Sequence, residues 1–109
     1  SDECITWDRI HTIIADALGV EPRIVHVPSE AIAALAPKFG PGLLGDKRYS
    51  VVFDNSKIKR FVPGYEATIP FHRGVDRSVR WLMADPERQQ IDEETDRIID
   101  SIIDGYRLR

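Results

Sequence analysis

The chain has 109 residues, 42% of them hydrophobic and 30% charged, and its formal net charge is −3. This composition is typical of one soluble globular domain. No run is long and apolar enough to predict a membrane span or a signal peptide, so we expect no membrane partner. The single cysteine, Cys4, excludes an intrachain disulfide and fits a reducing, cytoplasmic location. The only methionine is Met83, from which we expect that an upstream segment was removed.

Charge is segregated along the chain. Residues 1–45 carry a net charge of −3, residues 46–80 carry +4 and residues 81–104 carry −6. A basic middle favours contact with phosphates, whereas the acidic flank would repel a long polyanion. A small phosphorylated ligand therefore fits this balance better than a nucleic acid does.

The N-terminal part predicts a helix followed by a strand. Thr6 is a good N-cap, apolar residues recur at helical spacing over residues 7–18, and Gly19 can supply a left-handed stop. Residues 23–27 are rich in branched side chains and predict a short strand that ends at Pro28. One face of this strand would carry Ile24, His26 and Pro28, and the other Arg23, Val25 and Val27.

The middle of the chain predicts a helix, a glycine-rich connection and a second strand. Residues 29–35 are alanine-rich and predict a helix capped by Ser29, whereas residues 37–45 predict a loop or a broken helix. Residues 50–53 predict a short strand, after which Asn55 or Ser56 would cap a single helical turn.

The C-terminal part predicts two longer helices. Residues 65–69 are expected to be extended, and residues 71–84 carry a helical apolar pattern. Asp92 would cap the last helix, which presents an apolar stripe over Ile98–Ile103. We therefore predict an α+β fold, a single domain over residues 1–109 with about four helices and two or three short strands.

The segment Gly40–Gly45 spells G-x-G-x-x-G, the pattern of a dinucleotide-binding turn. That turn requires a preceding strand, but Ala31–Leu35 is helical in character, and Pro41 removes a backbone donor. We interpret the segment as a loop and expect no cofactor-binding residues. The three histidines show no spacing that predicts a metal ligand or a nucleophile's base.

Basic residues surround the segment Val51–Asp54, which overlaps the predicted strand: Lys47, Arg48, Lys57, Lys59 and Arg60. They indicate either a rim for a phosphate or a solvated surface. Asp54 and Asn55 are interpreted as caps of the following turn. Asp46 and Lys47 are the better functional candidates, because they follow a glycine loop where backbone and side chains can approach a ligand.

Three arginines, Arg73, Arg77 and Arg80, share one face of the predicted 71–84 helix. They indicate either a phosphate clamp or a solvated flank in which Asp76 forms local ion pairs. Arg73 lies at the helix start and is the member we expect to face a cleft.

Several short motifs follow one another in a fixed order: Thr6-Trp7, Ala15-Asp16-Ala17-Leu18-Gly19, Ile24-Val25-His26-Val27-Pro28, Gly45-Asp46-Lys47, Val52-Phe53-Asp54-Asn55-Ser56-Lys57, Pro63, Pro70-Phe71, Gly74-Val75 and Trp81. In this order the chain resembles the C-terminal part of a protein of the NAD-dependent epimerase/dehydratase family, the extended or atypical short-chain dehydrogenase/reductases. The resemblance covers nearly the whole chain.

The resemblance implies a missing half. In that family an N-terminal Rossmann domain binds NAD or NADP and carries a catalytic tyrosine with a lysine four residues later. Here Tyr49 is followed at that distance by Phe53 and Tyr65 by Ile69, so no catalytic residue is expected in this chain. The NAD(P) cofactor would be bound by the full-length protein and not by residues 1–109.

The implied role is closure over a small-molecule substrate, often a nucleotide sugar. The residues expected to line the substrate side are Asp46, Lys47, Tyr49, Ser50 and Arg73. Three function classes remain open: the substrate-binding domain of an epimerase, dehydratase or reductase; a non-catalytic protein-interaction module that uses the Ile98–Ile103 stripe or the arginine face; and an RNA-binding atypical family member. The acidic stretch over residues 81–104 disfavours the last. A homodimer is a separate open possibility for the partner.

Overall fold

The computed structural model describes residues 2–108, which divide into two compact units. Within the described residues, unit 1 comprises residues 2–24 and 52–90, and unit 2 comprises residues 25–51 and 91–108.

The α+β prediction is wrong, because residues 2–108 contain helices and no strand. The segments predicted as strands, residues 23–27 and 50–53, are non-helical, as is the expected extended segment over residues 65–69. A strand is stable only where a second strand accepts and donates its backbone hydrogen bonds. No described segment pairs with these three, so their branched side chains do not produce a sheet.

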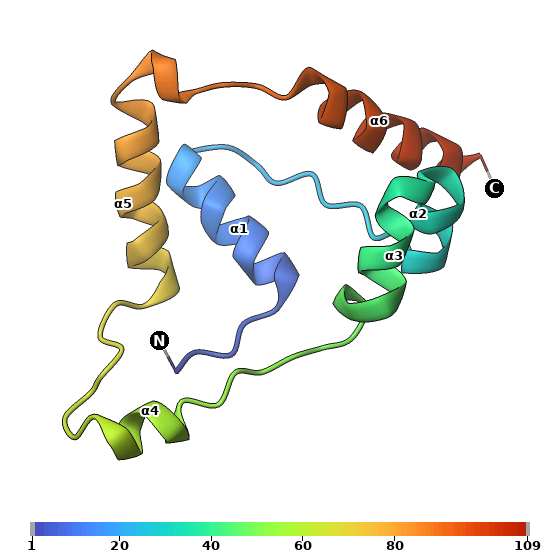
Figure 1. The fold of residues 1–109 in the computed structure, drawn as a ribbon. Helices are drawn as coiled ribbons and strands as arrows, with labels where there is room; N and C mark the ends of the chain where they lie inside the picture. Colours follow the sequence, from blue (N-terminus) through green and yellow to red (C-terminus); the bar gives the residue numbers. More distant parts are fainter. Residues whose placement is uncertain (1, 109) are drawn as a thin grey trace. The chain divides into compact units, whose positions relative to one another are not determined.

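Unit 1 contains α1 (Trp7–Leu18), α4 (Ser56–Phe61), α5 (Phe71–Met83) and a short 3₁₀ turn, η3 (Pro86–Arg88). Helices α1 and α5 pack against each other, as Figure 1 shows. Two α1 residues, Ile13 and Ala15, are buried in this unit.

Both ends of α1 follow the sequence prediction. The side chain of Thr6 accepts a hydrogen bond from the backbone N–H of Arg9 at 3.2 Å. At the other end Gly19 adopts φ +69°, and its N–H donates to the carbonyl of Asp16 at 3.1 Å. A left-handed residue at this place is accessible to glycine with little strain, which terminates the helix.

The N-terminal segment ties unit 1 together across the sequence. A carboxylate oxygen of Glu3 accepts from the backbone N–H of Phe71 at 2.7 Å, at the first turn of α5. The other acid, Asp2, accepts from the side-chain amide of Asn55 at 2.8 Å and from the ammonium of Lys59 at 2.6 Å. These contacts connect the start of the chain to α4 and α5.

Unit 2 is built on α2 (Ser29–Leu35), η1 (Pro37–Phe39), α3 (Gly40–Gly42), η2 (Leu43–Lys47) and α6 (Glu93–Arg107), which Figure 1 labels in part. Residues 37–45, predicted as a loop or broken helix, form successive helical turns. The first is 3₁₀, the second α and the third, η2, is a π-helical turn.

Small residues let the helices of unit 2 approach closely. A Cβ atom added at Gly40 would lie 3.3 Å from Cβ of Ala33 on α2. One added at Gly105 on α6 would lie 2.9 Å from Cδ2 of Leu35. The buried apolar residues of this unit are Ala36 and Ile102.

The caps of unit 2 divide into one confirmed and one wrong prediction. Asp92 caps α6, and its carboxylate accepts from the N–H of Thr95 at 3.1 Å. Ser29, in contrast, is the first residue of α2, and Pro28 precedes it without a side-chain cap. No helix within residues 2–108 is long and apolar enough to cross a membrane.

Candidate ligand-binding site

The π-helical turn η2 is the most distinctive backbone feature of unit 2. The N–H of Arg48 donates to the carbonyl of Leu43, five residues back, at 3.0 Å. Such single π turns occur frequently at functional sites. The turn carries Asp46 and Lys47, the two residues that the sequence favoured most.

Arg48 fixes this turn to its surroundings. Its guanidinium Nη2 lies 2.7 Å from Oε1 of Glu30 on α2, and its Cζ lies 5.6 Å from the centroid of the Tyr49 ring. An arginine that is paired with a carboxylate and rests on an aromatic face is already engaged. Arg48 therefore positions the turn, and Lys47 is the better candidate for contact with a ligand.

An apolar groove of about 510 Å³ lies in unit 2 beside this turn. It is lined by Val25, Val27, Ile32, Lys38, Phe39, Gly42, Leu43, Lys47, Ile99, Ile102 and Ile103. Most of the apolar side chains in this lining are half-buried. The volume falls within the range of sites for small organic ligands, which are concave and mostly apolar with a few polar groups.

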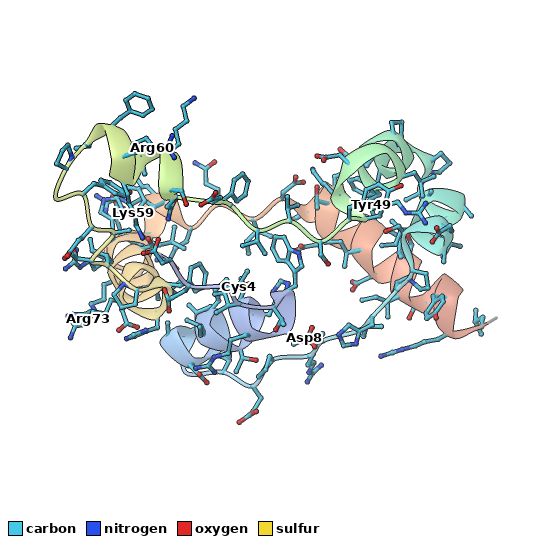
Figure 2. The ribbon with its side chains drawn as sticks, turned by 90° about the horizontal axis from the view of Figure 1, so that it is seen from below. Cys4, Asp8, Tyr49, Lys59, Arg60 and Arg73 are labelled. Atoms are coloured by element: carbon cyan, nitrogen blue, oxygen red, sulfur yellow. The ribbon has the colours of Figure 1, made fainter. Side chains whose placement is uncertain are left out.

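Four of the five predicted substrate-side residues belong to one short segment of unit 2. Asp46 and Lys47 lie on η2, and Tyr49 and Ser50 follow it; all four are exposed. The fifth, Arg73, lies in the first turn of α5 in unit 1. Figure 2 labels Tyr49 beside the helices of unit 2, and Arg73 on α5.

Asp54, Asn55 and Lys59 are engaged with other parts of unit 1. Asp54 accepts from the N–H of Ser56 at 2.8 Å and from its hydroxyl, and these bonds lower the pKa of the Asp54 carboxyl. The capping role predicted for Asp54 is thus confirmed. Asn55 makes no side-chain cap and donates to Asp2 instead. The hydrogen bond from Lys59 to Asp2 raises the pKa of the Lys59 ammonium.

The arginine face of α5 is solvated. Arg73, Arg77 and Arg80 are exposed, and Arg80 lies 4.0 Å from Asp76 one helical turn away. An exposed pair of this kind contributes little to stability.

The groove lining is what sequence reasoning missed. It comes from the segment before α2, from the turns between α2 and residue 47, and from α6. The Ile98–Ile103 stripe was a signal for its α6 wall, but the stripe by itself does not indicate which segments face it. Val25 and Val27 were interpreted as one face of a strand, and instead they line the groove.

Within residues 2–108, no group of three or more histidine, cysteine, aspartate and glutamate side chains is arranged to hold a metal ion. Comparison with protein-family models, with curated proteins and with solved structures gives no match to this chain.

Proposed function

We propose that this chain is the substrate-binding part of an NAD(P)-dependent epimerase, dehydratase or reductase that acts on a nucleotide sugar or a similar small molecule. In this proposal a separate Rossmann domain binds NAD or NADP and carries the hydride chemistry. The present chain covers the substrate and contributes specificity.

The observation that carries the proposal is the large exposed surface, which calls for a partner domain. The accessible surface of the chain is 9141 Å². A compact monomer of 12.4 kDa exposes about 6,100 Å², and two separate compact bodies of the sizes of units 1 and 2 would together expose about 7,400 Å². The chain thus exposes about 1,700 Å² more than the two-body estimate, an excess comparable in size to a specific, stable protein interface.

The exposed surface includes many large apolar side chains. Twenty large hydrophobic side chains of the described residues are exposed, and fourteen of them lie in unit 1. Phe53 is 88% exposed and Trp7 is 74% exposed. Large apolar side chains exposed in this number favour an interaction surface. We therefore assign unit 1 the larger share of the contact with the Rossmann domain.

The substrate side is assigned to the segment that follows the glycine turns. Asp46, Lys47, Tyr49 and Ser50 supply a carboxylate, an ammonium and two hydroxyl groups within five residues of chain. Such groups can bind sugar hydroxyls and a diphosphate.

The test is calorimetry on the longest naturally produced protein that contains these residues, titrated with NAD, NADP and a panel of nucleotide sugars. We expect saturable binding of one dinucleotide and of at least one sugar. Lys47→Ala should weaken sugar binding about tenfold or more and leave dinucleotide binding unchanged, because a charge-assisted hydrogen bond is lost. Lys57→Ala, a lysine on α4, is the matched control.

Residues 1–109 alone should bind NAD no better than an unrelated protein. Stoichiometric NAD binding by residues 1–109, or no dinucleotide binding by the longer natural protein, would contradict the proposal.

The same exposed surface supports a second candidate, a protein-interaction module without catalysis. It predicts tight association with another protein. It also predicts that no natural protein containing these residues binds a dinucleotide or a nucleotide sugar. The two candidates therefore give opposite results in the same titration.

A further inference from the structure

We propose that the groove of unit 2 binds a small amphiphilic carboxylate, with its hydrocarbon chain on the groove floor and its carboxylate at the lysine rim. This inference does not rest on the proposed function. The groove lies wholly within unit 2, and its ligand would bind without a dinucleotide or a second domain.

The floor of the groove suits a hydrocarbon chain. Its apolar side chains come from α6, α2 and the segment before α2, and Ile102 among them is buried. Of the large exposed hydrophobic side chains, only Ile99 belongs to the lining. The groove is thus a distinct, partly closed hollow. Each methylene placed in it gains favourable transfer free energy.

The charged residues at the rim favour a ligand with a negative charge. Lys38 and Lys47 are the only charged residues in the lining, which contains no carboxylate. Within residues 2–108 Lys47 has no ion-pair partner, and the ammonium of Lys38 lies 3.9 Å from Glu94 with both side chains at least half exposed. Such a pair is weak enough to admit a competing anion.

These two features together select the ligand class. An uncharged amphiphile would fill the floor without pairing the lysines, and a cationic one would be repelled by them. A polyanion without an apolar body would leave the floor in contact with water. A monocarboxylate with a hydrocarbon chain satisfies both parts of the lining.

The experiment is calorimetry of this chain with decanoate, kept below its aggregation concentration, against decanol and decyltrimethylammonium. We expect decanoate to bind with one site per chain and more tightly than the other two. Octanoate should bind about fifteenfold more weakly than decanoate, because two methylenes are removed from the floor.

Two glycines in neighbouring turns give a matched pair of blocking variants. Gly42 lines the groove and Gly45 does not, and a Cβ atom added at either would meet no atom within 4 Å. Gly42→Phe should fill part of the groove and weaken decanoate binding at least tenfold, whereas Gly45→Phe should leave it unchanged. The circular dichroism of both variants should match the unchanged chain.

The lysine rim is tested separately from the floor. The double variant Lys38→Gln with Lys47→Gln should weaken decanoate about threefold to tenfold and leave decanol unchanged, since two exposed charge contacts are removed. Lys57→Gln is the control. Equal affinity for decanoate and decanol, or unchanged binding by Gly42→Phe, would overturn the proposal. A third result would also overturn it: decanoate does not bind, and the chain forms a dimer that Gly42→Phe abolishes. The occupant of the groove would then be a second copy of the chain.

Discussion

Unit 1 and unit 2 use their apolar residues in different ways. In unit 2 small residues at Gly40 and Gly105 let helices approach closely, and half-buried side chains enclose a groove. In unit 1 most of the large apolar side chains lie on the surface, and charged N-terminal residues connect α4 and α5. Half-buried apolar residues around a hollow suit a small ligand, whereas exposed ones suit an extended partner surface.

Truncation of a core isoleucine should have the largest effect and should act within its own unit. Ile102→Ala in unit 2 and Ile13→Ala in unit 1 should each lower the free energy of unfolding by about 2–5 kcal/mol, because a buried side chain leaves a cavity. Amide hydrogen exchange should rise on α2 and α6 in the first variant and on α1 and α5 in the second. Equal increases in both units for either variant would show that they unfold as one body.

The close approach of α2 and α3 in unit 2 predicts the next largest effect on stability. Gly40→Leu should lower the free energy of unfolding by about 1–3 kcal/mol, because Cβ of Ala33 already lies 3.3 Å from the new Cβ position. Gly45→Leu in the adjacent turn meets no atom within 4 Å and should change stability little. Chemical denaturation of both variants measures the difference, and equal losses would show that the helix approach is not the cause.

Two glycine-to-alanine substitutions in unit 1 should change the free energy of unfolding by smaller amounts, one upward and one downward. Gly74→Ala in α5 should raise the free energy of unfolding by about 0.5–1 kcal/mol, because alanine favours the helix and the added Cβ meets no atom within 4 Å. Gly19→Ala should lower it by about 1 kcal/mol, since φ is +69° there. Thermal unfolding of the two variants measures both signs, and a stabilising Gly19→Ala would contradict the assigned conformation.

The sequence predicts local features well and distant ones poorly. Thr6, Gly19 and Asp92 act on backbone groups within a few residues, so their caps and stops were predictable. The hydrogen bond from Phe71 to Glu3 spans 68 residues, and no local pattern indicates it. The same limit explains the failed strands, because branched residues alone do not indicate whether a pairing strand exists.

The candidate site shows the same division. Asp46 and Lys47 were predicted as site residues because they follow glycines, and this stays a prediction; the structure shows that both lie on a π turn. The segment that leads into that turn was predicted as a loop or a broken helix, since glycine and proline content indicates a break in regular structure but not the hydrogen bonds that replace it. The groove brings α6 to residues more than fifty positions earlier, so its floor was not predictable as one surface.

The polar tie of unit 1, which joins Asp2 to Asn55 and Lys59, should make a small, pH-dependent contribution to the stability of that unit. The hydrogen bonds that Asp2 accepts from Asn55 and Lys59 lower the pKa of its carboxyl below the usual 3.8. The bond to Asp2 raises the pKa of the Lys59 ammonium above the usual 10.5. A lowered carboxyl pKa contributes stability that is present above 3.8 and is lost as pH falls through the folded-state value. A raised ammonium pKa contributes stability that is present below 10.5 and is lost as pH rises through the folded-state value.

Asp2→Asn tests this window because the amide keeps the shape of the side chain and removes its charge. The thermal midpoint of Asp2→Asn should lie slightly below that of the unchanged chain near neutral pH, and the difference should shrink as pH falls well below 3.8. The difference should shrink again above 10.5, where Lys59 loses its proton. Asp100→Asn on α6 removes a charge from unit 2 and serves as the control. A difference that stays constant across this range would mean that Asp2 acts through its shape and not its charge, so the charged tie would then contribute nothing to what distinguishes unit 1 from unit 2.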